Sequence, residues 1–338
     1  MLFTKVSIHT IAHIQAPLSV SSATISKRLS ATLRRVRLPE NILERMTGIK
    51  ERRFWSGDTQ PSDVATEVAE KVIQKSGLSK NDIGAIISTS ITKDFIEPSI
   101  ASIVHGNLKL ATECINFDVG SACLGFLNGM QVAASMIEAG MLKHVLIVSG
   151  ESGHQGLEST LKRLENTNAS AEEVRSQLAT LTLGSGGVAM VLSHRDAAPS
   201  GHPIQSMLTL AATEHNRLCC GWHDRMETDA PELLKQAVRL KSKTFERSQT
   251  EFGCDLNSFD EIVFHQVGKS YINDAIKTLG IDERKVLRTY PEYGNMASAS
   301  LPFTLSKLEE MGRLQSGKKI ALVGAGSGLN SMVVEVLW

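Results

Sequence analysis

The sequence predicts an α/β protein in which one strand–helix unit is used twice. Short apolar runs, typical of strands buried on both faces, alternate with longer segments of helical periodicity. The order strand, helix, strand, long helix and strand within residues 79–151 recurs within residues 257–328, and such self-similarity indicates a duplicated unit. Alternating strands and helices imply mostly parallel pairing with right-handed crossovers inside each unit.

The first half of the chain begins with a strand. The opening residues, "MLFTKVSIHTIAHI", alternate apolar and polar side chains and include Lys5, so they are not typical of a secretory signal peptide. The first unit follows, with these predicted elements in chain order: a strand in "SKNDIGAIISTS", a helix from Pro98, a strand in "INFDVGSAC", a long helix, and a strand in "HVLIVSGE".

A more polar segment, about 152 to 215, separates the two units. It predicts a helical insertion at about 152–180 and then, in "ATLTLGSGGVAMVLS", a buried strand entered through a glycine-rich turn. We therefore divide the chain into an N-terminal half, 1–195, and a C-terminal half, 196–338. The second unit contains, in order, a strand in "NSFDEIVFHQ", a helix through "SYINDAIKTLG", a strand in "KVLRTY", a long helix, and a strand in "KKIALVGAG".

The two units can be aligned by the glycines that end their long helices. Gly140 follows Cys123 by 17 residues, and Gly312 follows Asn295 by 17 residues. We therefore expect Cys123 and Asn295 to occupy equivalent positions. Two units packed with pseudo-symmetry would bring equivalent loops near one shared centre, where a site could form.

Composition excludes several classes of function. The 36 basic and 36 acidic residues cancel, so no basic surface for nucleic acid is indicated. No apolar run approaches the roughly 20 residues that span a bilayer. The five cysteines form no CxxC pair, which favours a reducing cytoplasm over a disulfide framework. Cysteines and histidines also lack zinc-ligand spacing, so we expect no metal.

Cys123 is the first candidate catalytic residue. In "FDVGSACLGFLNGM" it follows a strand and opens a helix, where free N–H groups lower a cysteine pKa and favour the nucleophilic thiolate. The small neighbours Gly120, Ser121, Ala122 and Gly125 leave room for a substrate carbonyl, and the backbone N–H of Cys123 would point at its oxygen. The alternative is a buried cysteine that only packs a strand–helix joint.

His265 and Asn295 are candidate partners of this thiol. His265 directly follows a buried strand in "VFHQVGKS", and Asn295 lies in "EYGNMASAS". A neutral histidine and an amide are suitable donors to an enolate or thioester oxyanion. A structural role for His265 is the alternative, but three such residues at loop sites of a duplicated fold favour a catalytic set.

The glycine-rich end, "VGAGSGLNS", could suggest dinucleotide binding. Its spacing is G-x-G-x-G, whereas the dinucleotide fingerprint needs G-x-G-x-x-G at the start of a helix. The remaining "SMVVEVLW" predicts a strand, so the glycines predict a hairpin-like turn and no bound cofactor. We expect this backbone to approach the thiol closely, with the Ser327 N–H as a second oxyanion donor.

Glu97 is the last residue that stands out. Pro98 biases Glu97 away from helical geometry and would occupy the first helical position. The simplest interpretation is an acid that complements the dipole of the following helix.

Together these stretches resemble the thiolase superfamily, specifically its ketoacyl synthase III group and, within it, the head-to-head acyl-CoA condensing enzymes of bacterial olefin biosynthesis. The resemblance covers essentially the whole chain. Besides the residues around Cys123, His265 and Asn295, these stretches carry it: "IAHIQAP", "TGIKERR", "DFIEPSIASIVHGNL", "LATLTLGSGGVAMV", "ATEHNRLCCGWHDRMETD" and "IALVGAGSGLNSMVVEVLW".

The resemblance implies a thiolase-like fold of five layers, α/β/α/β/α, and an obligate homodimer. It implies that Cys123 is acylated, that His265 and Asn295 bind a thioester or enolate oxygen, and that Glu97 reaches the partner subunit's site as the base. The implied reaction is a non-decarboxylative Claisen condensation of two long-chain acyl-CoAs to a 2-alkyl-3-ketoacyl product, released as a β-keto acid. The implied pathway partners are a ketone/acid reductase, a β-lactone synthetase and a β-lactone decarboxylase.

Two other functions stay open at this point. One is a decarboxylating 3-oxoacyl-acyl-carrier-protein synthase III, which uses a malonyl donor and needs no base. Against it, the H-Q-A-N pattern of that group is H-Q-V-G here, and the tryptophan that it carries ahead of "TGI" is Ile42. The other is a non-catalytic, acyl-binding scaffold, which an intact Cys/His/Asn set disfavours.

Overall fold

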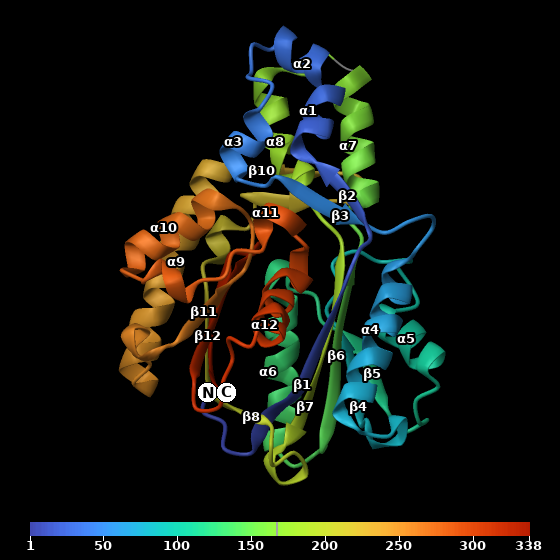
Figure 1. Ribbon diagram of the computed structural model, residues 1–338, viewed down its shortest axis with the longest axis vertical. Helices are drawn as coiled ribbons and strands as arrows, with labels where there is room; N and C mark the ends of the chain where they lie inside the picture. Colours follow the sequence, from blue (N-terminus) through green and yellow to red (C-terminus); the bar gives the residue numbers. More distant parts are fainter. Residues whose placement is uncertain (167) are drawn as a thin grey trace.

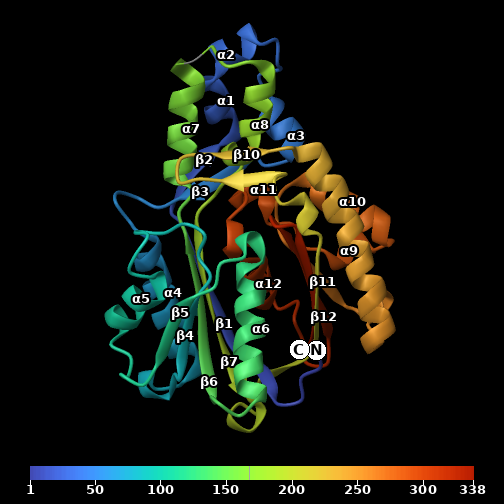
Figure 2. The same ribbon diagram turned by 180° about the vertical axis from the view of Figure 1, so that it is seen from behind.

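Two β-sheets face each other across a pair of helices (Figures 1 and 2). The computed structural model describes residues 1–166 and 168–338. The first sheet has the order β1 (Val6–Gln15), β7 (Gly186–His194), β6 (His144–Glu151), β4 (Ala85–Ser88) and β5 (Ile115–Asp118). The second has the order β11 (Glu261–Phe264), β12 (Lys319–Gly326), β13 (Asn330–Leu337) and β8 (His202–Ala211). A two-residue pairing of β1 with β8 joins them.

Helices complete the five layers that the family resemblance implies, with an apolar core between each pair of neighbouring layers. The central helices are apolar around most of their circumference, as expected of a helix packed on both sides. The outer helices bury only one stripe each. The pair α6 (Gly125–Glu138) and α12 (Ser300–Glu310) lies between the sheets, α4 (Pro61–Ser76) and α5 (Ile100–Leu108) cover the first sheet, and α9 (Ala230–Phe252) and α10 (Lys269–Leu279) cover the second.

A helical cap lies at one end of the sheets and has a core of its own (Figure 1). Two small two-stranded sheets lie between this cap and the main sheets: β2 (Leu18–Ser21) with β3 (Glu51–Phe54), and β9 (Cys219–Gly221) with β10 (Met226–Thr228). The cap helices are α1 (Ser22–Arg28), α2 (Ser30–Arg35), α3 (Ile42–Thr47), α7 (His154–Asn166) and α8 (Ala171–Leu181).

Strand pairing is parallel inside the repeated units and antiparallel elsewhere. β4 pairs in parallel with β5 and β6, and β11 pairs in parallel with β12, as predicted. β7 returns antiparallel to β6, and β13 forms the predicted hairpin with β12. The prediction of mostly parallel pairing therefore holds within the units but not for the sheets as wholes.

The strand predicted in "KVLRTY" is wrong. Residues 286–289 form no ladder, and Thr289 already has helical backbone angles. The side chain of Gln266 bonds backbone groups of this segment instead. Its amide nitrogen donates to the carbonyl of Leu287 at 3.1 Å, and its oxygen accepts from the N–H of Thr289 at 3.2 Å. A side chain thus replaces the strand pairing that β5 makes in the first unit.

The predicted equivalence of Cys123 and Asn295 is also wrong. A 3₁₀ turn precedes each central helix, η2 (Ala122–Leu124) before α6 and η7 (Ala297–Ala299) before α12, and each turn begins with an alanine at positive φ, 45° and 49°. Cys123 therefore corresponds to Ser298. The glycine spacing concealed this because α6 has 14 residues and α12 has 11, a difference of about one helical turn.

Candidate active site

Cys123 lies in the turn η2, two residues before α6 begins at Gly125. The predicted position at the mouth of a helix is thus confirmed. Gly125 is required for close packing, because a Cβ there would lie 2.9 Å from the carbonyl oxygen of Thr89 and 3.0 Å from Oγ of Ser298. The turn with Cys123 is therefore pressed against the end of β4 and against η7.

The glycine-rich end of β12 packs on the other side of Cys123. A Cβ on Gly326 would lie 3.1 Å from the backbone nitrogen of Leu124 and 3.3 Å from that of Cys123, and one on Gly324 would overlap the side chain of Leu124. The glycine-rich backbone therefore lies close to the backbone of the residue that carries the thiol. Ser327, the proposed second oxyanion donor, is the next residue, in the turn before β13, and is partly exposed.

The thiol of Cys123 is protonated in the resting chain. Part of the residue is accessible, but burial raises the pKa of the thiol to about 12, helped by the negative charges of Cys219 and Glu151. The sequence predicts that the helix terminus lowers this pKa. Burial of the sulfur has the larger effect, because it disfavours the charged thiolate. The thiol must therefore lose its proton to a base as it attacks a substrate.

His265 directly follows β11 and is fully buried. Its backbone N–H donates to the carbonyl of Val323 in β12 at 3.1 Å, so the residue is held beside the glycine-rich end of that strand. Burial, together with the nearby charge of Lys241, lowers the pKa of His265 to about 3. The imidazole is therefore neutral at physiological pH, with one nitrogen able to donate and the other able to accept.

Asn295 is held on both sides by backbone hydrogen bonds. Its N–H donates to the carbonyl of Thr182 and its carbonyl accepts from the N–H of Gly184, both at 2.9 Å. Neighbouring glycines allow this contact: a Cβ on Gly184 would overlap the carbonyl oxygen of Tyr293, and Gly294 has a φ of 67°. The side-chain oxygen of Asn295 accepts from the N–H of Ala297 at 3.0 Å, so its amide nitrogen is the group left to donate to a substrate.

The fold brings together the elements that carry these three residues. The turns η2 and η7 pack against each other, with Oγ of Ser298 3.3 Å from Oγ1 of Thr89. Thr89 directly follows β4, and His265 directly follows β11 in the same way. The strand β12 provides both the Val323 carbonyl that bonds His265 and Gly326, which packs against Cys123. The ends of both units thus meet around the thiol, as the pseudo-symmetry predicted.

Glu97 lies at the protein surface, and it forms no hydrogen bond or ion pair with these three residues. It is exposed in the loop between β4 and α5, and no residue that the structure describes forms a hydrogen bond or ion pair with it. The prediction that Pro98 occupies the first helical position is wrong: α5 begins at Ile100, and its N-cap is Ser99, whose Oγ accepts from the N–H of Ser102 at 3.1 Å. Pro98 therefore lies outside the helix, and the carboxylate of Glu97 is free to act elsewhere.

Sequence analysis missed three buried charged or polar residues beside the site: Lys241, Tyr271 and Glu151. Lys241 was not recognised because a lysine in a polar helix usually faces solvent. One signal was present, since Lys241 falls on the same stripe of α9 as Ala237 and Phe245, which are both buried. Tyr271 and Glu151 gave no signal in the sequence.

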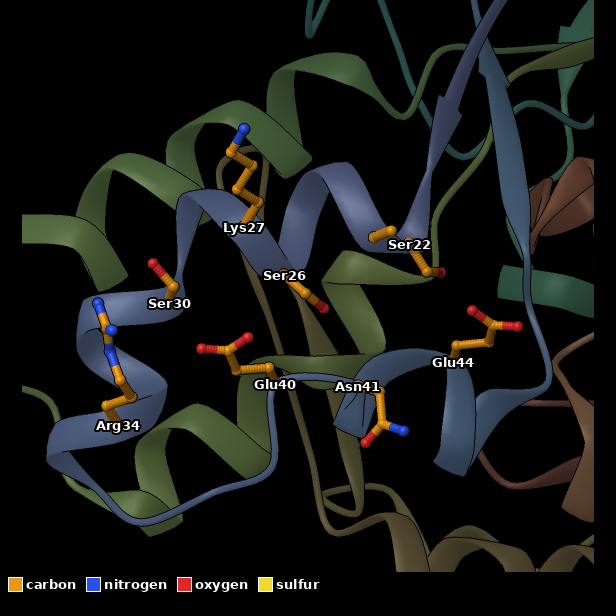
Figure 3. Close-up of a pocket in the computed structure, with 9 residues that line it drawn as sticks. Ser22, Ser26, Lys27, Ser30, Arg34, Glu40, Asn41 and Glu44 are labelled. Carbon is orange, nitrogen blue, oxygen red and sulfur yellow. The ribbon is translucent and has the colours of Figure 1, made fainter.

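Other parts of the described chain offer no rival centre. Residues 1–166 and 168–338 contain no cluster of three or more His, Cys, Asp or Glu side chains arranged to hold a metal ion. Within the same residues, none of the helices has the length and apolarity to cross a membrane. A groove of about 400 Å³ lies in the helical cap (Figure 3) and contains none of the candidate catalytic residues. The polar residues that line it are Ser22, Ser26, Lys27, Ser30, Arg34, Glu40, Asn41 and Glu44.

Comparisons with known proteins agree with this architecture. The family of 3-oxoacyl-(acyl-carrier-protein) synthase III matches residues 117–208, and the C-terminal family of the same enzymes matches residues 250–338. The acyl-CoA:acyl-CoA alkyltransferase of Xanthomonas campestris is 42% identical over 338 residues, covering 100% of both chains. The enzyme of that name from Shewanella oneidensis is 32% identical, also over 100% of both chains.

Solved structures extend the likeness to three dimensions. Crystal structures of Xanthomonas campestris OleA superpose with a TM-score of 0.98 at 42% identity, covering 100% of this chain and 98 to 100% of theirs. One of them contains bound cerulenin, and a Cys-to-Ser variant contains lauric acid and lauroyl-CoA. The β-ketoacyl-(acyl-carrier-protein) synthase III of Clostridium tetani is more distant, at 29% identity over 95% of each chain.

Full-length identity and superposition at this level establish the family. The chain belongs to the thiolase superfamily, in its ketoacyl synthase III group and alongside the OleA enzymes, and it is a condensing acyltransferase with a thiolase-like fold.

Proposed function

We propose that this enzyme joins two long-chain acyl-CoAs by a non-decarboxylative Claisen condensation, the first step of long-chain olefin biosynthesis. The observation that carries the proposal is that the turn η2, which holds Cys123, packs against η7, which follows Asn295, and against the glycine-rich end of β12, the strand that also holds His265. Relatives at 42% and 32% identity that bear the name acyl-CoA:acyl-CoA alkyltransferase support it.

In the first half-reaction Cys123 becomes acylated. The thiol gives up its proton, the sulfur attacks the carbonyl carbon of the first acyl-CoA, and coenzyme A leaves as the protonated thiol. His265 is neutral and within the same centre, so its unprotonated nitrogen can take the proton and pass it to the leaving thiolate. The backbone N–H groups of Cys123 and Ser327 would stabilise the oxyanion that forms.

In the second half-reaction the carbon–carbon bond forms. The carboxylate of Glu97 removes an α-proton from the second acyl-CoA, and the enolate attacks the acyl-cysteine carbonyl while the Cys123 sulfur leaves. An α-proton beside a thioester is weakly acidic, so the amide of Asn295 and the imidazole of His265 stabilise the enolate oxygen. The product is a 2-alkyl-3-ketoacyl-CoA, and attack by water releases the β-keto acid and coenzyme A.

This mechanism requires a homodimer, because Glu97 must reach the partner's thiol. Glu97 lies in the loop after β4, and the neighbouring strand β5 is the edge of the first sheet. Ile115 of β5 is 43% exposed. The adjacent loop exposes Phe95 by 59% and Ile96 by 89%, directly before Glu97. An exposed strand edge beside large apolar side chains is suited to pairing with a second copy. We propose that this edge forms the dimer interface.

The proposal includes the cellular setting. Coenzyme A enters only as part of the substrate, so no resident cofactor or metal is invoked. We expect the enzyme to act in the cytoplasm and to hand its β-keto acid to the reductase, β-lactone synthetase and β-lactone decarboxylase of the olefin pathway.

Incubation with a single substrate tests the reaction. The enzyme should convert myristoyl-CoA alone into a C–C-coupled β-keto acid, identified by mass as the acid and its decarboxylated ketone. A product that forms only when a malonyl thioester is added would assign the enzyme to the decarboxylating synthases instead. Absence of turnover together with an unmodified protein would indicate a binding scaffold.

Intact-protein mass spectrometry tests the nucleophile. Wild-type protein should gain one acyl group per chain from acyl-CoA, and iodoacetamide should abolish both the adduct and turnover. Cys123→Ser should give no thioester adduct, whereas Cys220→Ser, at a partly exposed cysteine of β9, serves as the matched control and should be acylated normally. An adduct of unchanged stoichiometry on Cys123→Ser would refute the assignment.

A further inference from the structure

Lys241 is buried in α9 in an unusual environment for a charged group. Only 1% of its surface is exposed, and no acceptor among the described residues bonds its Nζ. Nζ instead lies 3.6 Å from the ring centroid of Tyr271 and 5.7 Å from that of Phe264. A cation over an aromatic face is attracted by the ring quadrupole. Lys241 is thus fixed on the face of the Tyr271 ring.

The Tyr271 ring in turn contacts His265. The two rings meet edge to face, with centroids 6.2 Å apart and planes at 80°. This arrangement lies within the range of favourable aromatic pairs. Phe264, the second ring near Nζ, immediately precedes His265 in the chain. A continuous buried contact therefore runs from α9 through the first turns of α10 to the imidazole.

His265 lacks the usual device for orienting a catalytic imidazole. In most such sites one ring nitrogen bonds a carboxylate or carbonyl, and this bond fixes the ring and its tautomer. Neither Nδ1 nor Nε2 of His265 has a hydrogen-bond partner among residues 1–166 and 168–338. Packing against neighbouring side chains must therefore orient the ring.

We propose that Lys241 is a positioning residue of the active site: it holds the Tyr271 ring, and that ring holds the His265 imidazole in place of the missing hydrogen bond. The inference rests on the proposed role of His265 as the group that contacts substrate. It adds residues from α9 and α10 to a reaction whose other groups come from the ends of strands and from turns.

The electrostatics agree with this geometry. Burial lowers the pKa of Lys241 to about 7, with Asp274 of α10 opposing the shift. The ammonium charge is a further cause of the low pKa of His265. Burial also raises the pKa of Tyr271, with the negative charge of the Cys123 thiolate as a further cause.

The fold itself does not need the charge. A buried ammonium without an acceptor costs free energy, and an apolar side chain of similar length would avoid that cost. Residues that oppose stability in this way are typical of functional sites. A structural and a catalytic role for Lys241 therefore predict opposite effects of removing the amine.

Lys241→Met separates the two roles, with Lys243→Met as the matched control, because Lys243 is exposed on the same helix. Lys241→Met should retain or raise the Tm, lower kcat about tenfold and leave KM unchanged, since the loss of one cation–π contact is of that order. Lys241→Arg should recover part of kcat, and Lys243→Met should match wild type. A Lys241→Met enzyme with wild-type kcat would overturn the proposal, as would a Tm that falls in proportion to kcat.

A second readout does not depend on turnover. In ¹⁵N-histidine-labelled protein, Lys241→Met should shift and broaden the His265 ring resonances, and Lys243→Met should not. Tyr271→Leu should produce the same change, and the double variant should be no worse than either single one, because both act along one path. Additive losses in kcat, or an unchanged His265 spectrum, would refute the coupling. If His265→Ala keeps full activity, the proposed catalytic role of His265 fails, and if the wild-type enzyme forms no product from myristoyl-CoA, the proposed function fails. The spectroscopic test of the contact between Lys241, Tyr271 and His265 stands in either case.

Discussion

Gly326 lies directly against the backbone amide of Cys123. A Cβ at position 326 would be 3.3 Å from the nitrogen of Cys123 and 3.1 Å from that of Leu124, closer than side chains normally approach. The C-terminal hairpin is thereby packed onto the turn that presents the thiol. Residues separated by 203 positions, from Cys123 to Gly326, thus form one surface of the site.

Gly326→Ala should lower the acylation rate about tenfold or more, because the turn η2 must shift to accept the methyl group and small misplacements of reacting atoms are costly. The burst of CoA release on mixing with acyl-CoA measures this rate. Gly106→Ala is the control: a Cβ there meets no atom within 4 Å, and alanine is favoured in the helix α5. Equal bursts from both variants would show that the close approach has no catalytic role.

Asn295→Asp should abolish most activity and preserve the fold. The aspartate can still accept the hydrogen bond from the N–H of Ala297, but it cannot donate, and its charge opposes an enolate. Loss of one oxyanion donor typically costs about 10²–10³ in rate. Turnover and Tm should be measured on the same preparation. An active variant, or an inactive one that is unfolded, would contradict the assigned role.

Glu97→Gln should be acylated normally and then stall before condensation, because glutamine cannot take a proton. Loss of a positioned base costs roughly 10²–10⁴ in rate. Mass spectrometry should therefore detect an acyl-enzyme that accumulates while no β-keto acid appears. Full condensation activity in this homodimer would exclude Glu97 as the base.

Mixed dimers test whether Glu97 acts on the partner subunit. In a dimer of a Cys123→Ser chain and a Glu97→Gln chain, crossing leaves one site with both groups and the other with neither. About half of wild-type activity should then return. If Glu97 serves its own chain, each site lacks one group and the mixed dimer is inactive, which would disprove the crossing.

Glu151→Gln should accelerate alkylation of Cys123 and impair condensation. The buried Glu151 carboxylate accepts the N–H groups of Ile91 and Thr92 at 2.9 and 3.1 Å, so it anchors the loop that leads to Glu97. Its charge also contributes to the raised pKa of Cys123, so its removal increases the thiolate fraction. Iodoacetamide kinetics at about pH 8.5 measure the effect, since the pKa of Glu151 is raised by burial to about 7 and the group is ionised there.

The control for that experiment is Glu113→Gln, at an exposed residue between α5 and β5. It should alkylate at the wild-type rate. A Glu151→Gln variant with unchanged alkylation and unchanged condensation would show that neither the charge nor the loop anchor matters.

Removal of the Lys241 amine should change how stability depends on pH. Burial lowers the pKa of this amine from 10.5 to about 7 in the folded chain. Between these values the unfolded chain binds a proton that the folded chain does not, so the wild-type free energy of unfolding rises with pH in this window. Below it, the folded protein bears the full cost of a buried charge. The Tm of Lys241→Met minus that of wild type should therefore be larger near about pH 6.5 than near about pH 10. A difference independent of pH would contradict the burial of the charge.

The sequence by itself determined the features that depend on near neighbours in the chain. The strands and helices of the repeated units other than "KVLRTY", the small residues around Cys123, His265 after a buried strand and the glycine-rich turn before the last strand are all local patterns, and the structure places them as predicted. These patterns can be recognised in the sequence because a strand buried on both faces requires apolar residues, and an accessible helix start requires small ones.

The register between the two units was not determined in this way. Counting back from Gly140 and Gly312 paired Cys123 with Asn295, whereas the turns η2 and η7 pair it with Ser298. Helix length is set by the sheets that each helix must span, and nothing in the local sequence records it. Likewise, segment 286–289 has strand-like composition, but the Gln266 side chain bonds the carbonyl of Leu287 and the N–H of Thr289.

Only the tertiary structure decided the electrostatics of the site. Lys241 is buried because α9 packs against α10 and the second sheet, and Glu151 is buried because the loop after β4 closes over the end of β6. The thiol of Cys123 has a raised pKa for the same reason, although its place near a helix terminus predicts the opposite. A pKa depends on how far a group is shielded from solvent and on the charges around it. Segments that are distant in sequence determine both.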